Sequence, residues 1–479
     1  MVSTLDEVEN TYSKHEQEMI DLADRIWDIP ETRFKEFESV KILTTYFEKV
    51  GFEVETGIGG IKTAFVAKYG NEGPVIGILG EYDALPGLSQ KAGSDVREAL
   101  VDGGNGHGCG HNLLGTAGVG AVVLLKEKID KGEIKGRIHY YGCPAEEGGS
   151  GKTFMVREGV FNDVDVALSW HPNSFTSVFN YSSLANYQVY FEFEGIASHA
   201  ANSPHLGRSA LDAVELMNVG VNYLREHIPT SARVHYAITN TGGKSPNVVQ
   251  SQAEVLYLIR ATTIKEVDEI YKRIVNIAEG AALMTETKVK VKFDKACSNY
   301  IPNDTINKIV YDKLQLVGLP TYTEEEMEYA KKMNKTISPS EFSSALSEIK
   351  SMYEDSEVEE LDKDEITFYP EVVPYQKSNH TMAGSTDVAD VSWVVPTSQF
   401  FTTCFVLGTP LHTWQLVSQG KTGLAHKGMI YASKVIALTA NELLQNPELI
   451  EQAKAELRKQ TKGQYVNPIP KEVVPNMYG

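Results

Sequence analysis

Four short apolar segments, each followed at once by polar or charged residues, constrain the fold of this chain more than any other feature. The segments are 73–80 (GPVIGILG), 136–143 (GRIHYYGC), 164–170 (VDVALSW) and 399–408 (QFFTTCFVLG). Their length, β-branched content and flanking glycines are typical of buried strands. Apolar residues at helical spacing indicate helices at 17–27, 37–50 and 113–129. Strands that alternate with helices predict an α/β domain built on a central mixed sheet.

The middle of the chain has another pattern and predicts a second domain, as a length of 479 residues favours. Strand-like and helix-like segments follow one another there in the order β-α-β-β-α-β, which is typical of a ferredoxin-like sandwich. The first and last strands of such a unit can lie side by side. We therefore predict an inserted domain at 185–296 within a discontinuous domain formed by 1–184 and 297–479. The acidic segment 321–366 is predicted to be a solvated surface excursion, and the tail from 467 to be extended.

Composition and charge exclude several kinds of partner. A formal charge of −19 argues against nucleic acid and against an anionic membrane, since both favour a basic surface. An acidic small molecule could still bind, but it would need a local cationic pocket. No apolar run reaches the length of a membrane span, and the first residues do not resemble a secretory signal. Four widely spaced cysteines do not suggest a disulfide framework, so we expect a cytoplasmic protein.

Metal-ligand side chains follow the predicted strands, where the carboxyl ends of a sheet form a crevice for ligands. They are Cys109, His111, Glu147, His171 and His412. A thiolate, three imidazoles and a carboxylate suit zinc, or manganese or cobalt, rather than calcium or magnesium. Five ligands exceed the four of one structural zinc, which favours two metals with one bridging group. A buried cysteine beside a satisfied histidine remains the alternative for a Cys-x-His pair taken alone.

The adjacent acids in "PAEEGG" form the sharpest motif. Neighbouring strand residues point to opposite faces, so two adjacent glutamates share one site only where the strand has ended. Pro144 and the glycines after Glu147 place that end here. One glutamate can then bind metal while the other takes a proton from the attacking water; two solvated loop carboxylates are the alternative. A phosphate-loop reading of "GGSGKT" fails, because that pattern needs glycine where Glu146 stands.

Five longer motifs carry a resemblance to a known family. They are "GEYDALPGLSQ", "NGHGCGHNLLGTA", "YGCPAEEGGSGKTFMVREGVF", "HAANSPHLGRSALDAV" and "GTPLHTWQLVSQG". The chain resembles the metal-dependent peptidase, aminoacylase and desuccinylase family that includes carboxypeptidase G. It is most similar to the amidohydrolase branch of auxin-conjugate and N-acyl amino acid hydrolases. The resemblance covers essentially the whole chain and is weakest across 321–378 and at both ends. It implies a di-metal catalytic domain that carries an inserted dimerisation or lid domain.

The resemblance also implies roles for individual residues. It makes Cys109 a bridging ligand of two divalent ions, Mn²⁺ or Zn²⁺, and gives the other ligand roles to His111, Glu147, His171 and His412. Glu146 becomes the general base, and Asp83 becomes the acidic residue that supports the metal site. Many members of the branch have aspartate where this chain has Asn112, which puts that support of the ligands in doubt.

Three residues of the predicted insert are implied in substrate handling. Relatives use the histidine that matches His199 to reach the partner's active site, where it stabilises an oxyanion. The positions of Asn247 and Arg260 hold the substrate carboxylate in related enzymes, and an arginine fork suits that group. An exposed loop histidine and a surface ion pair are the structural alternatives. His107, His205, His235 and His426 receive no role.

Together these features predict a metal-dependent hydrolase of the amide bond between an acyl group and an amino acid. An acyl- or aroyl-glutamate is the favoured substrate, and a general aminoacylase or dipeptidase is the alternative. The chain would form a homodimer, or a heterodimer with a homologous subunit, through the insert. A different possibility is a partner subunit that mainly contributes an interface and residues acting on a homologous chain.

Overall fold

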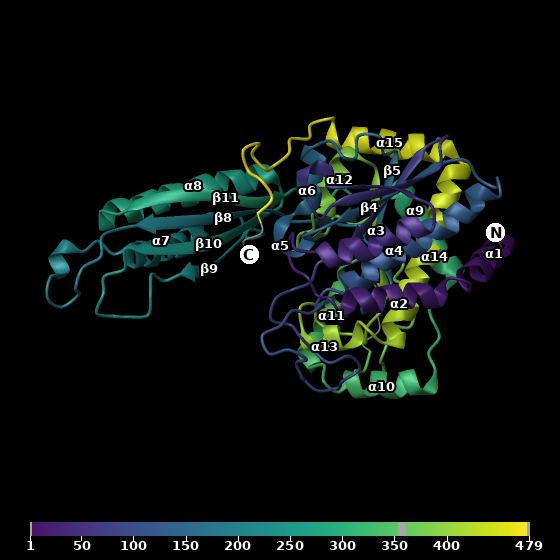
Figure 1. Ribbon diagram of the computed structural model, residues 1–479, viewed down its shortest axis with the longest axis horizontal. Coiled ribbons are helices and arrows are strands. Elements are labelled where there is room, and N and C mark those ends of the chain that lie inside the picture. The colour runs from purple at the N-terminus through teal and green to yellow at the C-terminus, as the bar shows by residue number, and fades with distance from the viewer. Residues whose placement is uncertain (1, 353–360, 477–479) are drawn as a thin grey trace.

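A computed structural model describes residues 2–352 and 361–476, with only the backbone of residues 2–4. Figure 1 shows a large body and a slender arm that projects from it. The body contains both outer parts of the chain, and the arm contains the segment from β8 to β11. No helix among the described residues is long and apolar enough to cross a membrane.

A seven-stranded mixed sheet forms the centre of the body, in the order β1-β2-β4-β3-β5-β13-β6. The middle strands β4, β3, β5 and β13 run parallel, while β1, β2 and β6 pair antiparallel at the edges. The four predicted strands are confirmed as β3, β4, β5 and β13. The bounds are β1 Glu53–Thr56, β2 Phe65–Tyr69, β3 Val75–Glu81, β4 Arg137–Cys143, β5 Val166–Asn173, β6 Ser177–Val178 and β13 Thr397–Thr403. A small parallel pair joins β7 Ser182–Ser183 to β12 Thr381–Met382.

Helices cover both faces of this sheet, which is why β3 and β13 are buried at every position. One face packs under a layer of long helices around α4, while α6 and α12 cover the other. The first layer comprises α1 Val2–Tyr12, α2 Glu16–Trp27, α3 Phe37–Lys49, α4 His111–Asp130, α9 Asp304–Val317, α14 Gly423–Gln445 and α15 Pro447–Thr461. The other helices of the body are α5 Glu146–Gly149, α6 Gly151–Arg157, α10 Glu324–Asn334, α11 Pro339–Ser351, α12 Val388–Val394 and α13 Trp414–Gln419, with the 3₁₀ turn η1 Ile58–Gly60.

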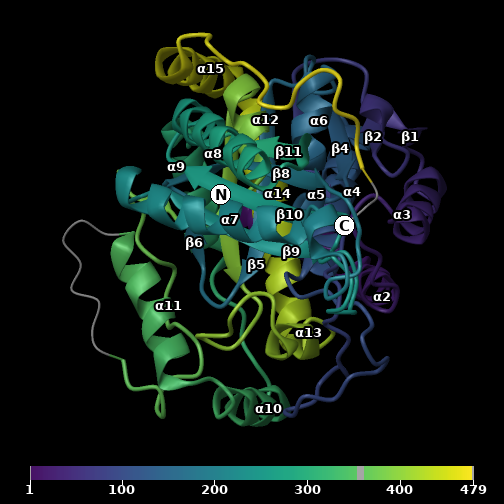
Figure 2. The same cartoon turned by 90° about the vertical axis from the view of Figure 1, so that its left-hand side faces the viewer.

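The arm is an antiparallel four-stranded sheet with two helices packed on it (Figure 2). Its elements are β8 Ala185–Glu194, α7 Ala210–Leu224, β9 Arg233–Asn240, β10 Gln252–Ala261, α8 Ile264–Thr285 and β11 Lys288–Cys297, with 3₁₀ turns η2 Pro204–Leu206 and η3 Arg225–His227. The sheet order is β11-β8-β10-β9, so β9 is an edge strand. The first and last strands of the segment, β8 and β11, pair directly.

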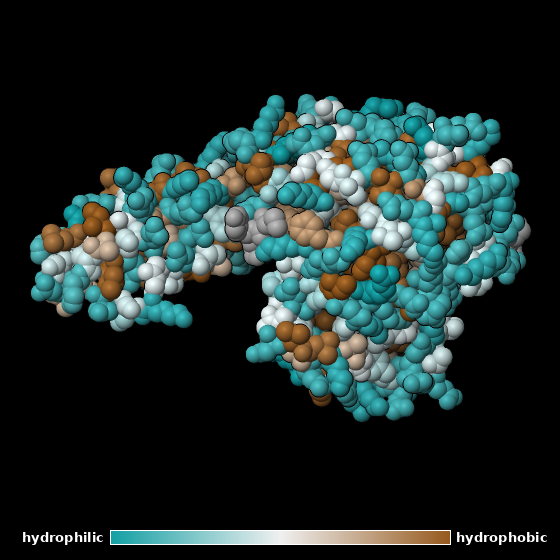
Figure 3. Space-filling model, viewed as in Figure 1, coloured by the Kyte–Doolittle hydropathy of each residue, from teal (hydrophilic) through white to brown (hydrophobic). Residues whose placement is uncertain are grey.

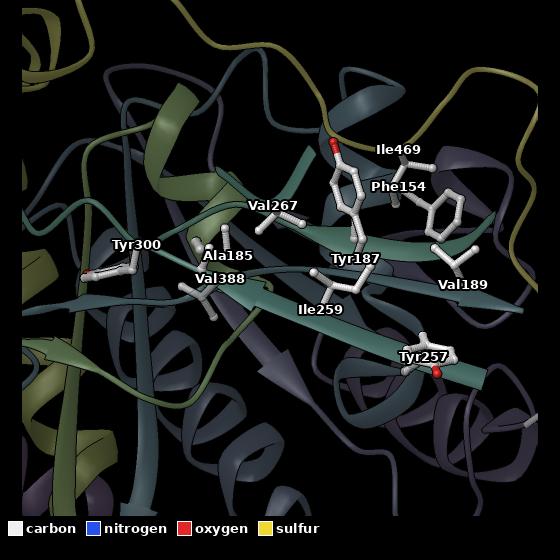
Figure 4. Packing of buried hydrophobic residues seen from close by; sticks show 14 of the residues in the cluster. Phe154, Ala185, Tyr187, Val189, Tyr257, Ile259, Val267, Tyr300, Val388 and Ile469 are labelled. Carbon is white, nitrogen blue, oxygen red and sulfur yellow. The ribbon is translucent and has the colours of Figure 1, made fainter. Parts of the chain in front are cut away.

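The base of the arm shares a hydrophobic core with the body. Figure 4 shows Tyr187, Val189 and Ile259 of the arm close to Phe154 and Ile469, and all of them belong to one cluster of buried residues. A buried ion pair adds a polar connection, because Arg33 Nη2 lies 2.7 Å from Asp294 Oδ1. The arm is therefore fixed to the body at its base by packing as well as by its two chain connections.

The acidic segment 321–366 departs from its prediction. Its helices α10 and α11 bury apolar side chains, among them Met333, Phe342 and Ile349. The prediction of a solvated excursion is therefore wrong for the described parts of the segment, and residues 353–360 lie outside them. The sequence of this segment is helix-prone, but its many charged residues gave no sign that these helices bury apolar side chains. Residues 467–476 contain no helix or strand; the rest of the predicted extended tail, 477–479, also lies outside.

Candidate active site

Five elements bring the predicted ligands together at the carboxyl ends of the parallel strands. Cys109 ends the loop before α4, and His111 is the first residue of that helix. Glu147 lies in α5 directly after β4, His171 is in β5, and His412 follows β13. The Cys109 Sγ atom lies 3.3 Å from His171 Nε2. On the other side, His412 Nε2 lies 3.2 Å from Glu147 Oε2.

Two groups of ligand atoms share the thiol of Cys109. One group comprises Cys109, His111 and His171, and the other comprises Cys109, Glu147 and His412. Within each group the ligand atoms lie within 4.8 Å of one another. The ligand atoms of these two adjacent groups lie close enough together to bind divalent metal ions.

The chemistry of the donors fits divalent zinc or manganese. Glu147 Oε1 is buried, and among the described residues it has no hydrogen-bond partner. Such a buried polar atom is costly unless something else satisfies it. The Nδ1 of His171 donates to the carbonyl oxygen of Pro172 at 2.8 Å, which leaves Nε2 as the free ligand atom. The residues present therefore fit a metal-binding role.

Backbone conformations of positive φ occur at the turns that present these ligands. Ala145 and Ser150, on either side of the EEGG turn, have φ of 59° and 53°, and His412 has φ of 60°. Non-glycine residues adopt this region at an energetic cost, which is often found at functional sites. Gly110 has φ of 77° between Cys109 and His111, and a Cβ there would lie 2.7 Å from Cγ of Pro172. The turn that presents both ligands thus requires glycine.

The pKa values in the site follow from burial and close opposite charges. Hydrogen bonds to Cys109 and Glu147 raise the pKa of His412 to about 11. Burial opposes the charge of Glu147, but His412 and His111 lower its pKa to about 2. Burial raises the pKa of the Cys109 thiol, with a further contribution from Glu147. Burial and the charge of His111 lower the pKa of His171 to about 4. His412 and Glu147 thus stabilise each other's charge, and a ligand role for His412 requires that it lose its proton when metal binds.

Glu146 lines the pocket beside the ligands, in the same helical turn as Glu147. Burial raises its pKa well above the ordinary value, and the carboxylates of Glu81, Asp387 and Glu147 raise it further. A carboxyl group with a raised pKa near an attacking water is suited to accept and return a proton.

Asp83 supports two of the neighbouring groups at once. Its Oδ1 atom lies 2.8 Å from His111 Nδ1, and its Oδ2 accepts a hydrogen bond from the backbone N–H of Glu147 at 2.9 Å. Asn112 is directed elsewhere, because its Nδ2 donates to the carbonyl oxygen of Gly420 at 3.0 Å. Asn112, which stands where many members of the branch have aspartate, therefore does not orient His111; Asp83 does.

A buried charge cluster next to Glu146 was not predicted from the sequence. The Nζ of Lys152 lies 2.5 Å from Glu81 Oε1 and 2.7 Å from Asp387 Oδ1, and Glu81 Oε2 lies 3.2 Å from His111 Nε2. Lys152 is the lysine of "GGSGKT", and its complete burial between two carboxylates is further evidence against a phosphate loop. In the sequence, the only indication of Glu81 as a site residue was its position two residues before Asp83. Asp387 follows more than 200 residues later with no marking motif.

A pocket of about 460 Å³ opens in front of the ligands, within the usual size of small-molecule sites. Strands of the arm supply Asn186, Gln188, Arg260 and Lys295 to its lining. The Nε of Arg260 is buried, and among the described residues it has no hydrogen-bond partner. Arg260 therefore faces the same pocket as the metal-ligand groups.

His199 and Asn247 lie at the opposite end of the arm from Arg260. The backbone N–H of Ala200 donates to the carbonyl oxygen of Asn247 at 3.0 Å, which holds the two loops together. Residues 252–259 of β10 separate these loops from Arg260, a distance of roughly 27 Å in an extended strand. His199 is exposed, and it does not line the pocket. Within one chain, Arg260 and Asn247 therefore do not meet.

The remaining histidines have structural surroundings or lie on the surface. His107 Nε2 lies 3.0 Å from the carbonyl oxygen of Ile26, and His426 Nε2 lies 2.8 Å from Asp24 Oδ1. His205 and His235 are exposed on the arm. All four cysteines are unpaired and buried.

The chain is similar to known proteins over most of its length. Residues 77–303 match the peptidase family M20/M25/M40. One subunit of the p-aminobenzoyl-glutamate hydrolase of Escherichia coli (strain K12) is 52% identical over 471 residues, which cover 98% of each chain. The Xaa-Arg dipeptidase of Mus musculus is 28% identical over 91% of this chain and 88% of that protein.

A solved structure shares the fold over most of its length. It is a dinuclear metal-binding peptidase of the M20 family from Bacillus subtilis, with a TM-score of 0.55, 17% identity, and coverage of 90% of this chain and 99% of that chain. At this identity the likeness shows the fold alone. The relative with 52% identity over nearly the whole chain decides the family. This chain, in which Cys109 belongs to two ligand groups beside the EEGG turn, is a member of peptidase family M20/M25/M40.

Proposed function

We propose that this chain is a metal-dependent amidohydrolase that cleaves p-aminobenzoyl-glutamate to p-aminobenzoate and glutamate. One observation carries the proposal: members of both ligand groups that share Cys109 line the same pocket as Glu146 and Arg260, whose Nε has no hydrogen-bond partner among the described residues. A metal site, a proton acceptor and a cation for a carboxylate are what hydrolysis of an acyl-glutamate requires. The substrate is proposed from the name of the E. coli relative.

Two divalent ions, Mn²⁺ or Zn²⁺, would be held by the two ligand groups that have Cys109 in common. Cys109, His111 and His171 would hold one ion, and Cys109, Glu147 and His412 the other. When bound, the ions supply Lewis acidity that polarises the amide carbonyl and makes water acidic enough to attack near neutral pH. Asp83 would fix the orientation of His111 from behind, as outer partners of histidine ligands do.

Glu146 moves the protons of the reaction. It takes a proton from the attacking water, and it returns that proton to the leaving nitrogen when the carbon–nitrogen bond breaks. Atoms balance, because the water supplies the hydroxyl group of the new carboxylic acid and one hydrogen of the new amine. Arg260 binds a carboxylate of the glutamate, since its fork of N–H donors matches that group. Its place on β10 puts the glutamate on the arm side of the pocket.

The arm is proposed to be a ferredoxin-like dimerisation and lid domain, with boundaries near 185 and 296. Its edge strand β9 and its helix α7 carry exposed apolar side chains: Leu216, Val219, Tyr223, Tyr236 and Ile238. An unpaired edge strand with apolar neighbours is suited to association with a similar surface. Figure 3 shows the arm standing clear of the body beyond a deep notch, which leaves room for a partner.

Such a partner would complete the active site. The distance between His199 and the pocket of its own chain requires that His199 act on another subunit, if it acts in catalysis. His199 and Asn247 of a partner subunit would then contribute an oxyanion donor and a carboxylate ligand. The name of the E. coli relative describes one subunit of a hydrolase, which supports a homologous subunit as the partner besides a second copy of this chain.

The purified chain, freed of metal and then loaded with Mn²⁺ or Zn²⁺, tests the proposal. We expect release of glutamate from p-aminobenzoyl-glutamate with metal and none after chelation. An acyl-amino acid or dipeptide cleaved far faster than p-aminobenzoyl-glutamate would replace the proposed substrate with the aminoacylase or dipeptidase alternative. Activity that requires addition of a homologous subunit, even with metal bound, would instead identify a heteromeric enzyme. The absence of amide hydrolysis under all these conditions would contradict the proposal.

A further inference from the structure

One wall of the pocket comes from the acidic segment that was expected to be solvated. Helix α11 supplies Glu341, Ser344, Ala345 and Glu348 to the lining. Packing fixes the orientation of this helix, because its other face buries Phe342, Leu346 and Ile349. Its first turn also packs closely on the loop that leads to His412, where a Cβ on Gly408 would lie 2.9 Å from Cα of Phe342. The side chains of α11 therefore face the same space as the metal-ligand groups.

Glu348 offers this pocket a carboxylate without a protein partner. Among the residues that the structure describes, none donates a hydrogen bond to it or forms an ion pair with it. Water reaches the side chain, yet the protein around it raises the carboxyl pKa, because it removes part of the solvent that stabilises the charge. Glu341 differs, since its Oε2 already accepts a hydrogen bond from the backbone N–H of Ser338 in a capping box.

Aromatic rings connect the ligand groups with the surroundings of Glu348. The ring of His171 lies 6.4 Å from that of Phe401, and Phe401 lies 5.6 Å from Phe179. Phe179 in turn lies 4.4 Å from Tyr181, whose pKa is raised by burial and by the charge of Glu348. Phe179 and Phe401 line the pocket. A flat apolar group that extends from the metal-ligand groups along these rings would approach Glu348.

The two sides of the pocket thus differ in charge. The arm side presents Arg260 and Lys295. Elsewhere in the lining, β13 supplies Phe401 and the segment after β6 supplies Phe179, while α11 supplies the carboxylates of Glu341 and Glu348. A substrate with an anionic amino-acid end and an aromatic acyl end that carries an N–H donor matches both sides. A carboxylate on the acyl end would be repelled, and a plain benzoyl group would donate no hydrogen bond to the exposed carboxylate of Glu348, which would then stay hydrated.

We propose that Glu348 determines specificity for the acyl group by accepting a hydrogen bond from an aromatic amine on it. The proposal rests on the proposed function, and it assigns the acyl side of that same pocket to Phe179, Phe401 and Glu348. The amine is neutral near pH 7 and keeps both of its N–H donors for an acceptor. Glu348 plays no part in the bond-breaking step, so its contribution is to binding and positioning of the substrate.

Kinetics on a pair of substrates test this assignment. The metal-loaded enzyme and its E348A variant, which has no acceptor at this position, are compared on p-aminobenzoyl-glutamate and on benzoyl-glutamate, which lacks only the amine. We expect E348A to lower kcat/KM for p-aminobenzoyl-glutamate by about 10- to 100-fold, the range of a hydrogen bond to a charged group. The value for benzoyl-glutamate should change by less than about threefold. Inhibition provides a second readout, because p-aminobenzoate should inhibit the parent enzyme more strongly than benzoate, and E348A should remove the difference.

A matched control and the opposing outcomes complete the test. E328A replaces an exposed glutamate on α10 that does not line the pocket, so it should leave both substrates unaffected. Equal losses on both substrates in E348A would show a structural role, and no loss on either would show no contact; both outcomes overturn the proposal. A parent enzyme that cleaves neither substrate contradicts the proposed function itself, whereas cleavage of both with no preference for the amine contradicts only the role of Glu348.

Discussion

The carboxylate of Asp83 lies 2.8 Å from Nδ1 of His111, on the side of the ring away from the candidate ligand atom Nε2. The same carboxylate accepts the backbone N–H of Glu147 at 2.9 Å. One side chain therefore orients a ligand from α4 and a ligand from the EEGG turn. Burial opposes the charge of His111, but Asp83, Cys109 and Glu81 raise its pKa well above the ordinary value.

Replacement of Asp83 by asparagine should weaken metal binding more than it weakens the fold. We expect a loss of metal affinity of about 10- to 100-fold, as for other outer partners of histidine ligands, because the amide no longer stabilises the histidine as a carboxylate does. A competition titration with a chromophoric chelator measures the affinity. Asp102→Asn changes an exposed residue of the loop before Cys109 and serves as the control. Unchanged affinity in Asp83→Asn would contradict the supporting role.

Variants of the two glutamates in the EEGG turn should differ in the amount of metal that they bind. Glu146→Gln should lower kcat by about 100-fold or more with metal content near normal, because it removes the proton acceptor. Glu147→Gln should lose metal, because it removes a ligand. Metal analysis of both purified variants, together with their turnover, decides the assignment. Loss of metal in Glu146→Gln with retention in Glu147→Gln would reverse the two roles.

Cys109 should be protected from thiol reagents by bound metal. The structure describes four buried, unpaired cysteines, and only Cys109 belongs to the ligand groups. A thiolate that binds metal is a poor nucleophile, so chelation should make one further thiol reactive. Mass spectrometry after labelling with and without chelator identifies the site, and Cys109→Ser should abolish the difference. Equal labelling of Cys109 in both states would exclude the ligand role.

His139 should make the fold sensitive to acid. Burial lowers its pKa from 6.5 to about 4 in the folded chain. As the pH falls from about 6.5 to about 4, the unfolded chain takes up a proton that folded His139 does not, so the folded state loses stability over this range. His139→Gln should therefore lose less unfolding free energy than the parent between pH 7 and pH 5, as measured by denaturant titration. His205→Gln, at an exposed position, should behave like the parent.

The sequence identified most of the candidate site because the ligands lie in local motifs. A strand followed by Glu146 and Glu147, or a glycine-flanked Cys-x-His, is visible without a fold, and the ends of parallel strands then bring such motifs together. Glu81, Lys152 and Asp387 were missed because their relationship exists only in three dimensions, as a buried charge cluster assembled from β3, α6 and the segment before α12.

The contribution of α11 was missed for a different reason. Charged residues such as Glu348 usually indicate a solvated face, and no periodicity distinguishes a carboxylate that faces solvent from one that faces a pocket. The strands of the arm were easier to predict, because alternation along β8 and β10 reflects one face packed under helices. The element order of the arm could be read from sequence, but the distance between His199 and Arg260 follows only from the length and direction of β10.

That distance leads to a prediction about assembly. If a second copy of this chain supplies His199, His199→Ala should lower turnover by about 10- to 1,000-fold, the range for loss of one oxyanion donor, with metal content unchanged. Mixing His199→Ala with Glu146→Gln protein should then restore activity, because each mixed dimer contains one site with both Glu146 and a partner's His199. With random exchange, half of the dimers are mixed and half of their sites are complete, so we expect about a quarter of the parent activity. Native mass spectrometry must show the exchange. If mixed dimers form and activity stays absent, His199 does not act across an interface between copies of this chain.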